Sequence, residues 1–126
     1  MVAQAVAFQP GDLVWLEFGG TSGHEQDGRR PAVVVSAGGY NARSSLILVC
    51  PVTSSGKPWP FKVKLAGETG GIDGHVLVDQ VRAIDPKARF ARQAGRISGA
   101  CLADIRVRLA VVLALPPETQ GDEIGL

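Results

Sequence analysis

The sequence predicts a mainly β fold: a small β-barrel followed by one C-terminal helix. Short apolar runs rich in β-branched and aromatic residues recur along the chain, and glycine-rich turns separate them. No helical pattern alternates with these runs, which argues against a parallel α/β sheet. The last apolar stretch has the 3–4 spacing of a helix.

The first expected strand is DLVWLEF, residues 12–18, between a Pro-Gly and a Gly-Gly pair. Further strands are expected at residues 31–37, 45–52, 60–65, 75–81 and 95–98. The run at 45–52 is continuously apolar, as a strand buried on both faces is. The run at 60–65 alternates, which places Phe61, Val63 and Leu65 on one face.

Residues 101–115 read as a helix, with Ser98 as its N-cap. Asp104 and Arg108 are four residues apart and form an expected ion pair. From residue 109 to 115 there is no polar side chain. Because a helix that is apolar all round needs cover on more than one side, we expect a second subunit to pack here.

One domain is expected, over residues 1–115 of the 126, with a disordered acidic tail at 116–126. Cys50 and Cys101 both lie in apolar runs, which favours buried free thiols over a disulfide. The sequence has neither a signal peptide nor an apolar run long enough to cross a membrane. We therefore expect a cytoplasmic protein.

The 13 Lys and Arg residues all precede Pro116, so the acidic tail conceals part of the positive charge of the body. Five basic residues gather against a single acid, Asp85: Arg82, Lys87, Arg89, Arg92 and Arg96. Such a patch suits a polyanionic partner, although a merely solvated surface has the same composition.

Three segments contain candidate site residues. The loop at 19–29 holds four glycines and Glu25, and it is either a variable hairpin loop or a lid over a ligand. Arg30 directly precedes a strand, where it can present a fixed guanidinium to a phosphate or form a surface ion pair. Thr53 and Ser54 follow the most apolar strand, where their hydroxyls serve either an oxyanion or a turn.

Two further pairs are ambiguous. Trp59 beside Lys57 can stack a nucleobase next to a phosphate contact, or fill the edge of the core. Asp79 and Gln80 interrupt an apolar run, so in a regular strand one of them points where apolar side chains point. Phosphate-loop, dinucleotide-binding and serine-hydrolase motifs are absent, and with only His24 and His75 no metal centre is expected.

Taken together, the segments GDLVWLEF, GHEQDGRRPAVVVS, YNARSSLILVCPVTSS, PFKVKL and DGHVLVDQVRAID resemble the MazF/PemK toxins of toxin–antitoxin systems. The resemblance covers residues 10–115, and the ordered set of motifs is specific. It implies an SH3-like β-barrel with a C-terminal helix, assembled as a homodimer. It also implies sequence-specific cleavage of single-stranded messenger RNA without a metal or another cofactor. A cognate antitoxin with an acidic disordered segment is the implied protein partner.

The resemblance assigns roles to individual residues. Arg30, Thr53 and Glu25 match the catalytic set, and Asp79 and Gln80 match an element that some members use near the cut. Ser54 stands where members often have Thr. The RNA contacts expected around this set are Arg29, Asn41, Lys57, Trp59 and Arg82.

The implied reaction is attack of the RNA's own 2′-hydroxyl on the neighbouring phosphate, which leaves a 2′,3′-cyclic phosphate and a 5′-hydroxyl. It needs a proton acceptor, a group that stabilises the phosphorane and a proton for the departing oxygen. Glu25 and Asp79 compete as the base. Two alternatives stay open: a barrel toxin that poisons DNA gyrase by binding, and an RNA-binding barrel without catalysis.

Overall fold

Strand β1 (Asp12–Glu17) forms where the β-branched and aromatic pattern predicts it. The computed structural model describes residues 7–18 and 28–116. Its other strands are β2 (Arg29–Val34), β3 (Ile47–Thr53), β4 (Lys62–Lys64), β5 (Gly67–Glu68), β6 (His75–Leu77), β7 (Arg82–Ile84) and β8 (Arg92–Ile97). The helices are α1 (Gly38–Arg43), the 3-10 turn η1 (Val78–Gln80) and α2 (Gly99–Leu113). The fold is mainly β with one long C-terminal helix, which confirms the predicted class.

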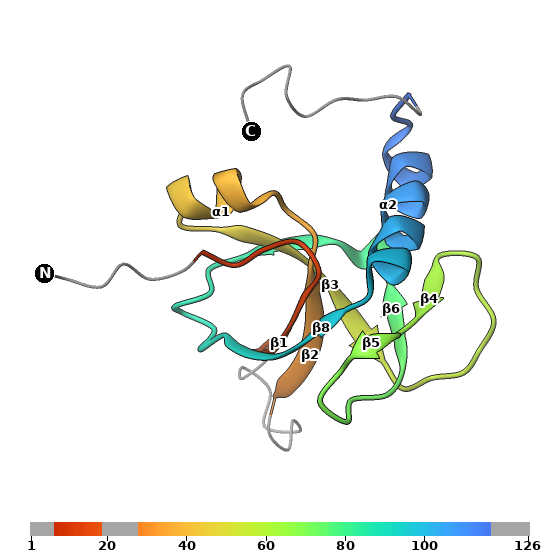
Figure 1. Ribbon diagram of the computed structural model, residues 1–126, viewed down its shortest axis with the longest axis horizontal. Helices are drawn as coiled ribbons and strands as arrows, with labels where there is room; N and C mark the ends of the chain where they lie inside the picture. The colour runs from red at the N-terminus through yellow and green to blue at the C-terminus, as the bar shows by residue number, and fades with distance from the viewer. Residues whose placement is uncertain (1–6, 19–27, 117–126) are drawn as a thin grey trace, which may run out of the picture.

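The strands form one antiparallel sheet in the order β4-β6-β3-β2-β1-β8-β5, with β7 paired to the other end of β3. The sheet curls into a half-barrel (Figure 1). Strand β3 lies at the centre of the curl, because it pairs with β2, β6 and β7. Strand β2 pairs with the middle of β3, β6 with its C-terminal end and β7 with its N-terminal end.

Two hydrophobic clusters lie on the two faces of the central strands. One gathers Leu13, Val33 and Cys50 with Ile105 of α2. The other gathers a second set of side chains from the same strands: Val14, Leu16, Ala32, Val34, Ile47, Val49 and Ile84. Burial on both faces explains why these strands read as nearly continuous apolar runs.

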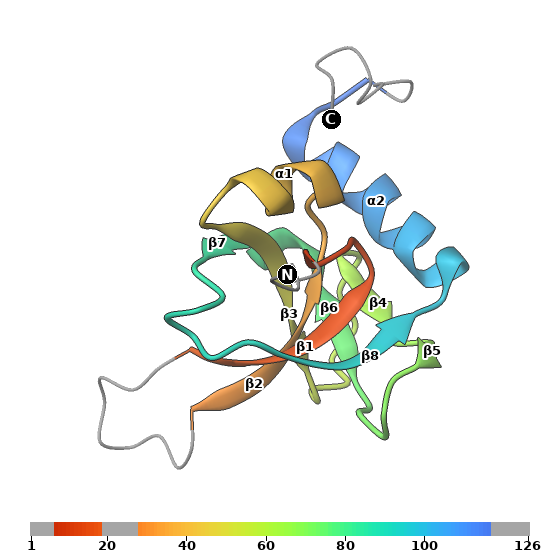
Figure 2. The ribbon, with the colours of Figure 1, turned by 60° about the vertical axis from the view of Figure 1, so that its left-hand side comes forward.

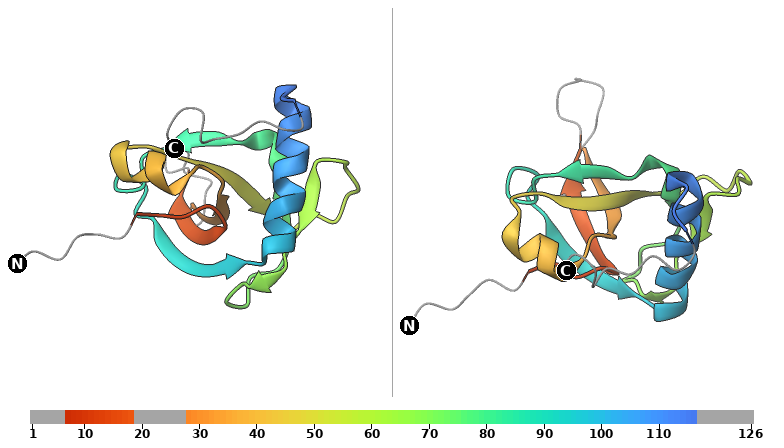
Figure 3. Two further views of the ribbon diagram at one scale, coloured as in Figure 1. Left: turned by 45° about the horizontal axis from the view of Figure 1, so that its top comes forward. Right: turned by 90° about the horizontal axis from the view of Figure 1, so that it is seen from above.

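Helix α2 begins at Gly99, where the Ser98 hydroxyl accepts a hydrogen bond from the Cys101 amide at 3.1 Å. This confirms the predicted N-cap. The predicted pair is also present, with Arg108 Nε donating to Asp104 at 2.8 Å. The helix runs along one side of the sheet in both views of Figure 3. Val107 and Val111, one turn apart, are 65% and 64% exposed, so this face of α2 is uncovered in a single chain.

The prediction of a strand over 75–81 is wrong beyond Leu77. Strand β6 ends there and the chain makes the turn η1, which buries Val78 and leaves both Asp79 and Gln80 exposed. Neither Asp79 nor Gln80 therefore has to point into the core, as one of them would in a regular strand. A tight turn lets both polar side chains reach solvent, which a straight strand does not.

Other boundaries also differ from the predicted ones. Strand β2 starts at Arg29 rather than Pro31, and β8 starts at Arg92. Leu48 is 36% exposed, so β3 is not buried on both faces along its whole length. The elements α1, β5 and β7 were not predicted from the sequence.

Both cysteines are buried free thiols, as expected. Burial, with a smaller effect of the nearby Asp79 carboxylate, raises the pKa of Cys50 to about 12. Burial also raises the pKa of Cys101. Within the described ranges no helix has the length and apolar character of a membrane span. Of the tail expected at 116–126, all but Pro116 lies outside the described residues, and so does the glycine-rich segment at 19–27.

Candidate functional site

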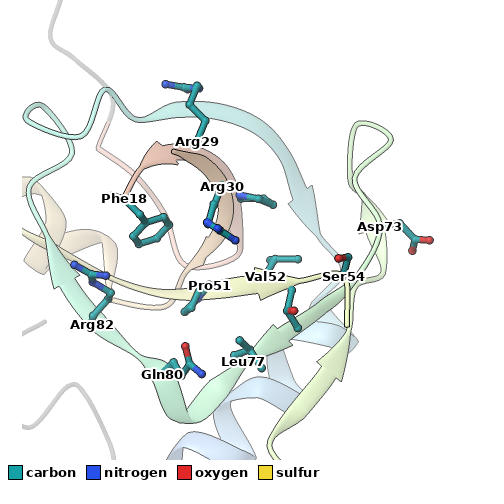
Figure 4. A pocket seen from close by; sticks show the side chains of 12 residues that line it. Phe18, Arg29, Arg30, Pro51, Val52, Ser54, Asp73, Leu77, Gln80 and Arg82 are labelled. Carbon is teal, nitrogen blue, oxygen red and sulfur yellow. The ribbon is translucent and has the colours of Figure 1, made fainter. Parts of the chain in front are cut away.

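A hollow of about 600 Å³ opens where β2, β3 and η1 come together. Its lining combines three arginines, two hydroxyls, an amide and a carboxylate with five apolar side chains: Phe18, Arg29, Arg30, Pro31, Pro51, Val52, Thr53, Ser54, Asp73, Leu77, Gln80 and Arg82. Figure 4 shows Arg30, Gln80 and Arg82 reaching toward its centre from three different elements. The hollow therefore brings together side chains that lie far apart in the sequence.

Arg30 belongs to β2, where it pairs with Leu16 of β1. Its chain neighbours Arg29 and Pro31 are also in register with β1, opposite Glu17 and Trp15, so the backbone of Arg30 lies within the strand rather than in the loop before it. Its side chain is exposed and points into the hollow (Figure 4). Arg29 faces the other way, at the rim, 3.7 Å from Glu17. Of the two adjacent arginines, Arg30 therefore points into the hollow and Arg29 lies at its edge.

Thr53 ends β3 and pairs with His75 of β6. Its Oγ1 accepts a hydrogen bond from the Ser55 amide at 3.1 Å. A hydroxyl that accepts still has its own proton to donate, so Thr53 retains a donor for a ligand oxygen. Gly74 lies against this residue: a Cβ there would come within 2.5 Å of the Thr53 carbonyl oxygen, at a φ of +140°. A side chain at position 74 would therefore push the end of β3 out of place.

Arg82 and Phe18 contribute another part of the lining. The Arg82 guanidinium carbon lies 5.0 Å from the centre of the Phe18 ring. A guanidinium stacked on an aromatic face keeps its N–H donors at its edge, where they can contact a phosphate. Gln80 adds an amide from η1 to the same hollow. The sequence did not identify Phe18 as part of the site, because an aromatic residue at a strand end reads as core.

Asp79 does not line this hollow. Its Oδ2 accepts a hydrogen bond from Trp59 Nε1 at 3.0 Å. Trp59 is 49% exposed and packs edge-on against Phe61, with ring centres 5.6 Å apart. Trp59 is therefore not a core residue: about half of its side chain is exposed, and its indole Nε1 is held by Asp79.

The segment between β3 and β4, residues 54–61, is fastened by two cationic side chains. The Lys62 ammonium donates to the carbonyls of Ser55 and Lys57, at 3.2 and 2.6 Å. Arg108 of α2 donates to the carbonyl of Pro60. Both contacts join residues that no sequence motif links. They hold the segment that carries Ser54, Lys57 and Trp59.

The position of Asn41 does not support the prediction that it contacts RNA. Its side chain is buried in α1, where its amide donates to the carbonyls of Phe8 and Ser36 and its oxygen accepts from the Ser36 hydroxyl. Asn41 ties the N-terminal segment to α1, and its polar atoms are fully engaged. Lys57 is exposed on the segment before β4, and the predicted Glu25 lies outside the described residues.

His75, for which the sequence indicated no catalytic role, is a neighbour of the site. It is paired with Thr53 across β3 and β6, and its Nδ1 is a buried atom with no hydrogen-bond partner within the described part of the chain. Over residues 7–18 and 28–116, no group of His, Cys, Asp and Glu side chains is placed to hold a metal ion.

A curled, mainly antiparallel sheet with one C-terminal helix and an open cationic hollow defines a small barrel domain suited to binding a polyanion. Residues 9–113 match the family described as the PemK-like, MazF-like toxin of type II toxin–antitoxin systems, and the chain belongs to this family. It is a toxin of that class.

Relatives and solved structures agree with this assignment. The endoribonuclease toxin MazF of Escherichia coli K12 is 40% identical over 103 residues, which cover 82% of this chain and 91% of that protein. The endoribonuclease MazF9 of Mycobacterium tuberculosis is 35% identical, covering 83% of this chain and 95% of that protein. The crystal structure of MazF from Deinococcus radiodurans superimposes with a TM-score of 0.75 at 41% identity, covering 86% and 98% of the two chains. A MazE–MazF complex from the same organism gives 0.78 at 38% identity, covering 87% and 99%.

Proposed function

We propose that this toxin is a metal-independent endoribonuclease that cuts single-stranded messenger RNA at specific sequences. The observation that carries the proposal is the convergence of Arg30, Thr53 and Arg82 on one open hollow. Relatives that cover most of this chain are named endoribonucleases. The charge and hydroxyl content of the hollow suits a phosphodiester group in particular.

In the proposed reaction the 2′-hydroxyl oxygen attacks the adjacent phosphorus while its proton passes to a base. The bond from phosphorus to the 5′-oxygen breaks, and that oxygen takes up a proton. Arg30 stabilises the charge on the pentacoordinate phosphorus, and Thr53 donates to one of its oxygens. The products are a 2′,3′-cyclic phosphate and a 5′-hydroxyl end.

The hydrogen bond between Trp59 and Asp79 bears on which carboxylate, Glu25 or Asp79, accepts the proton of the 2′-hydroxyl. Asp79 is engaged by Trp59 and lies off the hollow, so it fits a positioning role better than proton transfer. Of the two carboxylates matched to the family, Glu25 therefore remains our candidate base. Gln80, Ser54 and Arg82 line the hollow and are candidates for holding the RNA, with Arg29 at its edge.

We further propose that two chains associate through the exposed end of α2. An apolar groove of about 750 Å³ runs along this end, lined by Val35, Leu48 and Val81 of the barrel together with Val107, Val111 and Leu115. Burying this surface against a second copy provides the hydrophobic stabilisation that the isolated chain lacks. A cognate antitoxin is the second protein partner, and solved MazE–MazF complexes of similar chains support it. Its acidic disordered segment would compete with RNA for the cationic hollow.

The gyrase-poisoning alternative receives no support from α2. Gyrase-poisoning toxins of this barrel type rely on residues at the C-terminal end of the last helix, including a tryptophan, whereas residues 107–115 here contain no aromatic side chain. A barrel that binds RNA without cutting it has the same cationic surface, and an activity measurement separates it from the nuclease.

The test is to incubate the purified protein with a long RNA in EDTA and to sequence the new ends. Cuts at one short recurring sequence, with 5′-hydroxyl ends, are the expected result. Cleavage that EDTA abolishes and magnesium restores would contradict the metal-independent mechanism. RNA binding without new ends would leave only the non-catalytic barrel.

A further inference from the structure

Phe90 is the most exposed aromatic side chain in the described part of the chain. It lies in the connection between β7 and β8 and is 65% exposed. Its backbone has a φ of +53°, in the left-handed region. An exposed phenylalanine gains little from burial, and this backbone conformation costs free energy for a residue with a Cβ. Neither packing nor backbone preference therefore explains an aromatic residue here.

The local hydrogen bonds show which residue type this position favours. The Ala91 amide donates to the Pro86 carbonyl at 2.9 Å, and the Phe90 amide donates to the Lys87 carbonyl at 3.2 Å. This is the pattern of a Schellman motif that closes one helical turn, with Phe90 at the left-handed position. Glycine is the usual residue at that position. Stability alone would thus select glycine at position 90.

The turn that carries Phe90 is held firmly. Asp85 Oδ1 accepts from the amides of Lys87 and Ala88, at 2.9 and 3.3 Å. The Arg89 carbonyl accepts from the Glu17 amide at 2.9 Å, and the Arg89 guanidinium donates to the Phe18 carbonyl at 2.9 Å. The connection therefore lies against the end of β1, as Figure 2 shows. The Phe90 ring is presented from a fixed backbone, which limits the entropy lost when a ligand binds.

The surroundings of the ring are cationic. Phe90 borders a shallow hollow of about 510 Å³ whose other walls are Glu17, Arg29, Ala91 and Arg92. Glu17 is paired with Arg29, so Arg92 supplies the net charge. Arg29 lines this hollow and also the candidate site, so the two adjoin at its side chain. An exposed aromatic side chain that shares a hollow with two arginines, next to the proposed phosphodiester site, has the features of a single-strand nucleic-acid contact.

We infer that Phe90 is a stacking platform for one nucleobase of the RNA strand, beyond the nucleotides held in the candidate site, with Arg92 contacting the neighbouring phosphate. This inference rests on the proposed RNA substrate. It adds a subsite at the rim that the catalytic set does not include. Base stacking tolerates any nucleobase, because each base has a π face. The subsite therefore strengthens binding of longer strands without setting the sequence that is cut.

An apolar peptide segment is the competing occupant. Phe90 also borders a second hollow, lined on its other side by Phe8 and Ile47, where an apolar anchor of a protein partner has room. The charge of the first hollow favours RNA. Because a planar base needs an aromatic face while an apolar anchor needs only volume, Phe90→Leu distinguishes the two occupants.

The test compares two RNA strands that contain the same mapped cut site, each with a single 2′-deoxynucleotide to prevent cleavage. One strand spans only the cut site, and the other extends past it on both sides. Phe90→Gly should lower the ratio of long-strand to short-strand affinity by about 5- to 100-fold, the range for removing one stacking aromatic. Its melting temperature should equal or exceed that of the parent, because glycine suits the backbone. Phe90→Trp should keep the parent's ratio of long-strand to short-strand affinity. Phe90→Leu should lower this ratio about as much as Phe90→Gly does.

Arg92→Gln provides an independent measurement. It should reduce the slope of long-strand affinity against salt by about one phosphate contact. A Phe90→Gly protein with the parent's affinity ratio would overturn the inference, and so would a Phe90→Leu protein that binds the long strand like the parent. Parent protein that leaves both unmodified strands uncut would instead refute the proposed nuclease. The two failures are therefore distinguishable.

Discussion

The indole Nε1 of Trp59 donates a hydrogen bond of 3.0 Å to Oδ2 of Asp79, a residue 20 positions further along the chain. This contact joins the segment after β3, which also carries Ser54, to the turn η1. An acidic residue that was expected to act as a base or to touch the substrate thus holds an aromatic side chain in place. We therefore propose that Asp79 acts through Trp59.

The first prediction separates these two roles of Asp79. Asp79→Asn keeps an oxygen acceptor for the indole but removes the basic carboxylate, whereas Asp79→Ala removes both. Positioning predicts that Asn retains most of the parent's kcat and that Ala lowers kcat/KM and shifts the Trp59 fluorescence. The chain has a second tryptophan, Trp15, on β1. The fluorescence of Trp59→Phe gives the contribution of Trp15, which is subtracted to leave that of Trp59. Equal and large losses of kcat in both Asp79 variants would assign proton transfer to Asp79 instead.

A second prediction concerns Lys62, whose ammonium holds the carbonyls of Ser55 and Lys57. Lys62→Met keeps the alkyl chain and removes these hydrogen bonds. We expect faster amide hydrogen exchange in residues 54–61 and a several-fold rise in KM for RNA, with a smaller change in kcat. Lys64→Met is the control: it lies two residues along β4 on the same face, and its contact within the described residues is an exposed pair with Asp73 at 3.6 Å. Similar effects of both substitutions would reduce the role of Lys62 to general positive charge.

Arg30 is expected to act mainly on the transition state. Arg30→Ala should lower kcat by about 10²- to 10³-fold, the usual effect of removing one donor to a developing charge. RNA binding should weaken much less, because Arg29 and Arg82 are still available to contact phosphates. Arg43→Ala on α1, which is exposed and off the hollow, serves as the control. Parallel losses in affinity and in kcat would make Arg30 a binding contact only.

The proposed dimer is tested at Val111, which is 64% exposed on the apolar groove of α2. Val111→Asp would place an unpaired charge in the interface and should yield monomers by light scattering. Ala103→Asp puts the same charge at an exposed position on the same helix, outside the groove, and should leave the assembly as it is in the parent. An unchanged dimer in the Val111 variant would place the interface elsewhere.

How far the sequence predicts this structure depends on the range of the interactions involved. The strands β1 and β2 and the helix α2 follow local patterns, and the Ser98 cap and the Asp104–Arg108 pair follow from spacing alone. Six residues with two glycines give no such pattern for α1, which forms because Asn41 is bound by Ser36 and Phe8. Tertiary contacts decide these short elements, and a single sequence does not contain their partners.

The candidate site likewise contains residues that local motifs predict and contacts that they do not. Arg30 and Thr53 were predicted from motifs, and the structure brings both to one hollow. The contacts of Trp59 with Asp79 and of Arg108 with Pro60 each join segments separated by a long stretch of chain. The turn η1, which directs Asp79 toward Trp59, replaces the straight strand that the apolar run indicated. Side-chain roles that depend on such a turn could not be predicted from alternation.

The central claim is that the RNA supplies its own nucleophile, and the most direct measurement is cleavage of a strand with a single deoxynucleotide 5′ of the scissile phosphate. That change removes the 2′-hydroxyl and leaves the phosphate and both bases intact. Because phosphate contacts dominate affinity, the modified strand should bind nearly as well as RNA, resist cleavage and inhibit competitively. The unmodified strand should end in a 2′,3′-cyclic phosphate opposite a 5′-hydroxyl. Cleavage of the modified strand at the same bond would show that water is the nucleophile and would contradict the roles given to Arg30, Thr53 and Glu25.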